Sequence, residues 1–190
     1  MFYAYATIFL FITWRVYWRL SEIKADKEKS HTKKQVKGVD LGERISIIVL
    51  FLLATVQLLG WQVSPFPDYT DWAAPVGFFI VCIGFMISVF ARFTLGANWA
   101  NSYEYQIKKQ QELVTYGIYQ YIRHPIYTGV FLMLFGAEVI TQSYLILLYV
   151  FILVGMYWQA KREEEILLEH FGKAYESYIK TSKMFVPFVF

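Results

Sequence analysis

The residues of this chain best suited to chemistry stand together as Arg123-His124-Pro125-Ile126-Tyr127, directly before an apolar stretch. A guanidinium, an imidazole and a phenol are costly to keep near lipid unless they are paired, solvated or used. Pro125 disfavours helical geometry at His124 and suits the first turn of a following helix. We therefore predict Arg123 and His124 at a helix N-terminus, where unpaired backbone N–H groups and the helix dipole favour anions. The same residues also fit a structural role, with Arg123 reaching lipid headgroups and His124 capping the helix.

A second polar cluster lies closer to the C-terminus. Glu163, Glu164 and Glu165 open a segment with apolar residues at helical spacing, namely Ile166, Leu167, Leu168, Phe171, Tyr175 and Tyr178. An amphipathic segment of this kind lies against the protein or the membrane interface, and its acids can simply be a solvated helix face. The alternative hypothesis is convergence, in which an acid of this segment faces the imidazole and phenol of the first cluster across a polar pocket.

The elements that must position these clusters are apolar and long. The chain has 190 residues, of which 57% are hydrophobic, 20% aromatic and 17% charged, a composition more apolar than that of ordinary soluble domains. Five stretches approach the roughly 20 apolar helical residues that a bilayer core requires: about 1–18, 45–62, 72–95, 126–141 and 143–160. The fourth and fifth are joined through Gln142 alone, which predicts an antiparallel hairpin.

The predicted fold is therefore all-α: one polytopic membrane domain over residues 1–190, with five transmembrane helices. A cytoplasmic pocket is expected between the segment of about 96–129 and the tail of about 159–187. Basic residues predict the orientation, because the loop between the first two stretches and the segment after the fifth are rich in Lys and Arg, whereas SPFPDYTD has none. By the positive-inside rule, the N-terminus lies outside and the C-terminus in the cytoplasm.

Several kinds of function are disfavoured by composition. Cys82 is the single cysteine, so no intrachain disulfide forms, and the three histidines (His31, His124 and His170) lack metal-ligand spacing, so no metal is expected. The sequence has no glycine-rich phosphate loop. Its basic first loop mixes both charges without interleaved aromatic residues, which favours contact with membrane lipids over nucleic acid.

The motifs resemble the isoprenylcysteine carboxyl methyltransferase family of integral membrane methyltransferases. The resemblance rests on LVTYGIYQYIRHPIYTG, a membrane hairpin, and then EExxLxxxFGxxYxxY, with TLGANW (residues 94–99) upstream. It covers about residues 92–187, half of the chain, with two separated motifs in the family's order. The length of the chain fits a prokaryotic five-helix member and therefore a prokaryotic cell membrane.

The resemblance implies S-adenosylmethionine as the methyl donor and a lipophilic small molecule or prenylated cysteine that enters from the bilayer as the acceptor. Carried over by position, the donor-binding residues are Glu104, Gln111, Glu112, Leu113, Val114, Tyr119, His124, Pro125, Ile126, Tyr127 and Glu163. Acids suit the donor's ammonium and sulfonium, whereas His124 or the helix N-terminus suits its carboxylate, and Leu113 and Val114 suit its adenine.

The implied reaction is a direct displacement that uses no protein nucleophile and is promoted by proximity, alignment and exclusion of water. Arg123 is a candidate to position an acceptor carboxylate. Gln159 stands where the eukaryotic prenylcysteine enzymes have an arginine for this purpose, and a neutral amide cannot replace that charge. The turn also carries Ile118 where many relatives have proline or valine.

The leading prediction is O-methylation of a prenylcysteine-like or other lipidic carboxylate. One alternative is N-methylation of a phospholipid or another amine, which would require removal of a proton. A second is a sterol-type reductase that uses NADPH, which the short chain and the EExxLxxxFG tail disfavour. A third is a membrane protein that keeps the pocket for binding only. The sequence does not define the oligomeric state.

Overall fold

The computed structural model describes residues 1–28, 41–61, 63–67, 70–98 and 112–188. The described residues form six α-helices: α1 (Phe2–Glu28), α2 (Leu41–Leu58), α3 (Ala73–Leu95), α4 (Pro125–Thr141), α5 (Tyr149–Phe171) and α6 (Lys173–Thr181). Short 3-10 turns accompany them: η1 (Gly96–Asn98), η3 (Gly117–Gln120) and η4 (Tyr144–Leu148). The described chain contains isolated β-bridges but no named strand. The predicted all-α class is therefore confirmed.

Two helices extend beyond their predicted ends. α1 continues from the apolar stretch through Glu28, because the charged segment after Trp18 contains neither glycine nor proline to end it. α5 continues past Ala160 to Phe171, and Gly172 then ends it with a φ of 53°. The acidic run Glu163–Glu165 therefore belongs to the same helix as the apolar residues 149–160, which fixes its direction relative to the bundle.

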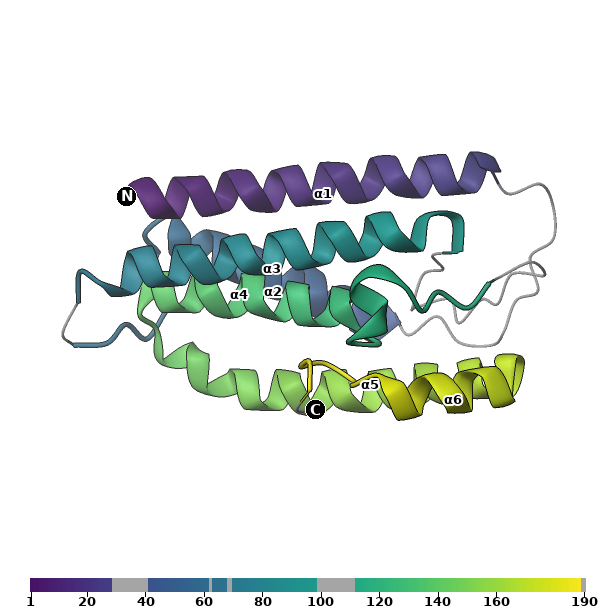
Figure 1. Cartoon of the computed structure of the whole chain (residues 1–190). Coiled ribbons are helices and arrows are strands. Elements are labelled where there is room, and N and C mark those ends of the chain that lie inside the picture. The colour runs from purple at the N-terminus through teal and green to yellow at the C-terminus, as the bar shows by residue number, and fades with distance from the viewer. Residues whose placement is uncertain (29–40, 62, 68–69, 99–111, 189–190) are drawn as a thin grey trace.

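Successive helices run in opposite directions, and α3 packs closely on α4 at the centre of the bundle (Figure 1). Glycines permit this approach: a Cβ added to Gly77 would lie 2.6 Å from the Gly136 carbonyl oxygen, and one added to Gly84 would lie 2.5 Å from that of Gly129. Small residues at a helix interface let two backbones approach in this way. We call these four residues the glycine seam.

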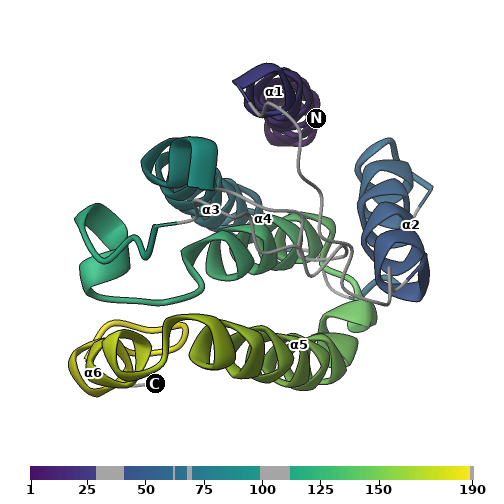
Figure 2. The same cartoon turned by 90° about the vertical axis from the view of Figure 1, so that its right-hand side faces the viewer.

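α1 packs on α3, and α2 packs on α4, so both outer helices are attached to the central pair (Figure 2). The indole N–H of Trp14 donates to the Ser88 hydroxyl at 3.0 Å, and the Trp14 ring stacks on Phe51 of α2. Gln57 of α2 donates to the Glu138 carboxylate of α4 at 2.9 Å, and both side chains are buried. These polar contacts fix the register of α1 and α2 against the central pair.

Two helical segments in the described chain are long and apolar enough to cross a membrane, Ala73–Leu95 and Tyr144–Phe171. Two shorter apolar segments are Ile45–Leu58 and Pro125–Thr141. The five predicted crossings and their orientation remain predictions. The C-terminal ends of α1, α3 and α5 and the N-terminal end of α4 lie at the same end of the bundle, which is where the polar clusters meet (Figure 1).

Candidate active site

The site is built on the N-terminus of α4. The helix begins at Pro125, and His124 precedes it with φ −120° and ψ 56°, outside helical geometry, as the His-Pro sequence predicts. The His124 side chain is 5% exposed, and its ring stacks on that of Tyr127, with centroids 5.4 Å apart and planes at 9°. The imidazole is therefore held in one orientation at the N-terminus of α4.

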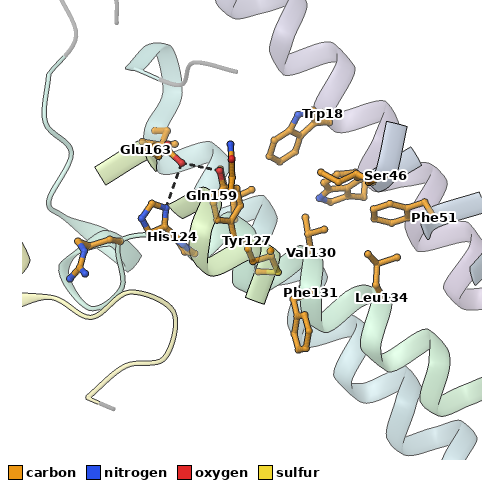
Figure 3. A pocket seen from close by; sticks show the side chains of 18 of the residues that line it. Trp18, Ser46, Phe51, His124, Tyr127, Val130, Phe131, Leu134, Gln159 and Glu163 are labelled. Atoms are coloured by element: carbon orange, nitrogen blue, oxygen red, sulfur yellow. Dashed lines mark hydrogen bonds and ion pairs between the residues drawn. The ribbon is translucent and has the colours of Figure 1, made fainter. Parts of the chain in front are cut away.

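Glu163 of α5 faces this pair of rings. The Tyr127 hydroxyl donates to Glu163 Oε2 at 2.9 Å, and His124 Nδ1 lies 3.6 Å from the same oxygen (Figure 3). The Glu163 side chain is 34% exposed, so its carboxylate remains accessible. The predicted convergence of an acid with the imidazole and the phenol is confirmed.

Glu164 shares His124 with Glu163 but pairs with Arg123 in place of Tyr127, because consecutive residues of an α-helix project about 100° apart. Its Oε1 accepts from Arg123 Nε at 2.6 Å and lies 3.4 Å from His124 Nε2. Both the Glu164 carboxylate and the Arg123 guanidinium are buried. Sequence reasoning selected only the first acid of the pair and missed Glu164, although the adjacent acid in EE was the available signal.

The chain after α6 returns to the start of α4, and we call residues 182–185 the C-terminal strap. The backbone N–H groups of Arg123 and His124 donate to the carbonyls of Lys183 and Met184 at 2.8 and 3.0 Å. Arg123 Nη1 also donates to the Ser182 carbonyl at 2.6 Å. The guanidinium therefore joins α5 to the strap, which is an arrangement that the sequence did not predict.

η3 is attached to α6 by a buried hydrogen bond. The Tyr178 hydroxyl donates to the Tyr119 carbonyl oxygen at 2.6 Å. Burial raises the pKa of both phenols above the ordinary value, so both remain neutral hydroxyls. This contact holds the turn that carries Tyr119 against α6.

A cavity of about 1200 Å³ extends from these groups into the bundle. All the predicted site residues in the described chain line it: Glu112, Leu113, Val114, Tyr119, Arg123, His124, Pro125, Ile126, Tyr127, Gln159 and Glu163. Glu104 and Gln111, which were also predicted to bind the donor, lie outside the described residues. The roles of all these residues remain predictions, but the fold brings the described ones to the wall of the same cavity.

The far end of the cavity is apolar and includes helices for which the sequence predicted no role. α1 and α2 supply aromatic and aliphatic walls, and α4 supplies Val130, Phe131 and Leu134 (Figure 3). The wall residues from α1 and α2 include Phe11, Trp14, Trp18, Ile48, Phe51 and Leu52. A single cavity thus joins an imidazole and carboxylates at one end to an apolar chamber at the other.

Comparison with known proteins defines the class to which this fold and site belong. A profile of the family described as phospholipid methyltransferase matches residues 72–174, which include α3, α4 and α5. In structure, the chain is similar to the eukaryotic intramembrane Ras methyltransferase, an isoprenylcysteine carboxyl methyltransferase, with a TM-score of 0.62 and 21% identity. The similarity covers 96% of this chain and 68% of that one. The protein is a helical membrane methyltransferase.

Curated relatives narrow the class. A probable protein-S-isoprenylcysteine O-methyltransferase of Oryza sativa subsp. indica is 30% identical over 129 residues, covering 65% of this chain and 67% of the relative. The Dictyostelium discoideum protein-S-isoprenylcysteine O-methyltransferase is 30% identical over 120 residues, covering 59% of this chain and 48% of the relative. The chain belongs to the isoprenylcysteine carboxyl methyltransferase family, as its motifs predicted. This membership favours the methyltransferase over the reductase and the binding-only alternatives.

Proposed function

We propose that this protein transfers a methyl group from S-adenosylmethionine to the carboxylate of a membrane-embedded acceptor, a prenylcysteine-like or other lipidic molecule. The observation that carries this proposal is the single cavity with a charged end and an apolar end. Its volume of about 1200 Å³ exceeds the usual 300–1,000 Å³ of a site for one small ligand. Donor and acceptor can therefore occupy it together.

The charged end suits the donor. S-adenosylmethionine carries an ammonium, a carboxylate and a sulfonium-bound methyl group that a carboxylate oxygen can take by direct displacement. Glu163 and Glu112 supply carboxylates for its positive groups, and the α4 N-terminus with His124 supplies donors for its negative group. Leu113 and Val114 line the same end and provide an apolar surface for the adenine ring of the donor. Glu104 and Gln111 complete the proposed set.

The apolar end suits a lipid chain, and its walls reach the outside of the bundle. Ile48 and Leu52 of α2 and Phe151 of α5 line the cavity and are each more than half exposed. In a bilayer these faces contact acyl chains, so an acceptor can enter sideways without crossing water. A lipidic acceptor from the membrane is therefore favoured over a water-soluble one.

The protein's contribution to the reaction is alignment and exclusion of water. Tyr127 and His124 hold the Glu163 carboxylate in place through the contacts of 2.9 and 3.6 Å. An acceptor carboxylate is ionised at neutral pH and needs no general base. Gln159 lies one turn before Glu163 on the same helix and is proposed to hydrogen-bond the acceptor head group.

Arg123 has a different proposed role. Its guanidinium is buried against Glu164 and the Ser182 carbonyl, so these contacts compete with an acceptor carboxylate. We propose that Arg123 holds the C-terminal strap and α5 in register, in place of the predicted contact with acceptor.

N-methylation of a phospholipid amine is the second candidate, and Gln159 favours it. The neutral amide lacks the charge that would attract a carboxylate, and an amine acceptor would need its proton removed before transfer. In this second candidate, Glu163 is proposed to accept that proton.

The test begins with calorimetric titration of the detergent-solubilised protein with S-adenosylhomocysteine, with NADPH as the control ligand. Saturable binding of S-adenosylhomocysteine alone is expected. Methyl-labelled donor is then supplied with N-acetyl-S-farnesylcysteine or with phosphatidylethanolamine. A carboxyl methyl ester releases labelled methanol in alkali, whereas an N-methyl product does not. Alkali-stable label on the phospholipid alone would replace the first candidate with the second, and binding of NADPH alone would refute both.

A further inference from the structure

Neither backbone conformation nor close helix packing explains why residue 155 is a glycine. Among the glycines in the described chain, four have positive φ, where glycine is favoured: Gly60, Gly96, Gly117 and Gly172. Four others form the glycine seam, where a Cβ would meet a neighbouring backbone within 2.7 Å. Gly155 belongs to neither group, since its φ is not positive and a Cβ built there would have nothing within 4 Å.

Gly155 is exposed and is part of the cavity lining, so the open space beside it includes part of the cavity. Glycine is unfavourable in the interior of a soluble helix and more frequent in membrane helices, and at Gly155 neither a positive φ nor a close backbone accounts for it. Room for a ligand beside the backbone supplies an explanation.

The position of Gly155 relates this space to the proposed chemistry. Gly155, Gln159 and Glu163 are spaced four residues apart and lie along one face of α5, and all three line the cavity. At a rise of about 1.5 Å per residue, Gly155 lies roughly 6 Å from Gln159 and 12 Å from Glu163 along the axis. Its neighbours on the cavity wall, Ile152 and Met156, are apolar, so this depth suits a hydrocarbon chain and not a head group.

We infer that the apolar chain of the acceptor passes α5 at Gly155, and that the absence of a side chain there leaves the room that this chain occupies. The inference rests on the proposed function and makes Gly155 a specificity-determining residue. A side chain at this position would project into the cavity and take up that room. Long, branched chains such as isoprenoids would then be excluded, whereas the donor end would be unchanged.

Protection of an engineered thiol tests this inference directly. In a Cys82→Ala background, Gly155→Cys and Val154→Cys place single thiols on adjacent residues of α5. Val154 is half exposed and is not part of the cavity lining, so it is the matched control. With S-adenosylhomocysteine present, N-acetyl-S-farnesylcysteine should slow maleimide alkylation at position 155 about tenfold and leave position 154 unchanged, because a bound chain covers only the cavity face. Equal rates at position 155 with and without the farnesyl compound would overturn the inference.

A kinetic comparison separates this inference from the proposed function. Gly155→Leu should lower kcat/KM for the farnesyl acceptor about tenfold or more, because added carbon in a filled channel is strongly unfavourable. Its affinity for S-adenosylhomocysteine should stay that of the parent, and Val154→Leu should keep the parent's kcat/KM. A parent that methylates no acceptor refutes the proposed function, and the protection experiment still decides the inference. A parent that is active, with an unchanged Gly155→Leu variant, refutes the inference alone.

Discussion

At the scale of single residues, Glu163 and Glu164 are neighbours with separate tasks. Glu163 is one-third exposed and lies at the cavity beside Tyr127, whereas Glu164 is buried beside Arg123. This division predicts that substitutions of the two acids affect different measurements. Glu163 should govern ligand affinity, and Glu164 should govern stability.

Glu163→Gln should weaken S-adenosylhomocysteine binding. A hydrogen bond to a charged group contributes about 1.5–3 kcal/mol, so the dissociation constant should rise by roughly tenfold to a hundredfold. Calorimetric titration measures this change. Glu165→Gln is the matched control, because Glu165 is exposed on the same helix and does not line the cavity. Equal affinity of parent, Glu163→Gln and Glu165→Gln would show that the donor does not bind at this carboxylate.

Arg123 and Glu164 should behave as a coupled pair. Glu164→Leu leaves the buried Arg123 guanidinium without its carboxylate, which costs about 3–5 kcal/mol. Arg123→Met should cost less, because Lys161 Nζ still lies 3.6 Å from the Glu164 carboxylate. The double variant should lower the free energy of unfolding by less than the sum of the two. Denaturant unfolding in detergent, followed by circular dichroism, provides the four values. Strict additivity would mean that the contact of 2.6 Å contributes no coupling.

The sequence contained most of the site but not its connections. His-Pro geometry predicted the start of α4, because it depends on local residue type, whereas the resemblance to the family selected Glu163. The roles of Glu164 and Arg123 depend on the rotation of α5 and on the return of the strap, and both are set by packing between distant segments. The apolar chamber was missed for the same reason, since nothing local in α1 or α2 distinguishes a cavity wall from a lipid-facing surface.

At the scale of elements, the glycine seam positions the site. It holds α3 against α4, and α4 carries Pro125, His124 and Tyr127 at its N-terminal end. Side chains within the seam would separate α3 from α4 and displace this central pair, on which α1 and α2 pack. The seam residues are therefore expected to tolerate substitution much less than Gly155.

Gly84→Ala and Gly155→Ala make the same chemical change in different surroundings. At Gly84 the new Cβ would lie 2.5 Å from the Gly129 carbonyl oxygen, whereas at Gly155 it would meet nothing within 4 Å. Overpacking costs typically about 1–3 kcal/mol, so Gly84→Ala should lower the melting temperature and Gly155→Ala should not. Thermal unfolding of both variants in one detergent measures the difference. Equal melting temperatures would show that α3 and α4 can adjust to the added methyl group without loss of stability.

Helix ends were the least predictable part of the elements. Apolar composition located α3 closely, because its stretch is bounded by turn residues. It stopped α1 and α5 too early, because a helix continues through charged residues when nothing breaks it and the polar end has water or partners. Gly172, with a positive φ, is the local residue that ends α5, and it lies well beyond the apolar stretch.

At the scale of the whole molecule, the distribution of basic residues predicts that the segment between α2 and α3 faces the opposite side of the membrane from α6. In a Cys82→Ala background, Pro67→Cys and Ser177→Cys introduce thiols at exposed positions in these two regions. In sealed vesicles that preserve the cellular orientation, a membrane-impermeant maleimide should label position 67 at once and position 177 only after permeabilisation. Labelling of both from the same side would contradict the predicted topology.

The C-terminal strap also has a consequence for the order in which the protein matures. Helices α1 to α5 are synthesised before the strap, so the N–H groups of Arg123 and His124 lack their carbonyl partners until residues 183 and 184 have been made. A nascent chain that stops short of the strap lacks two of the backbone hydrogen bonds that fix the start of α4. The surroundings of His124 are therefore among the last parts of the described chain to be completed during synthesis.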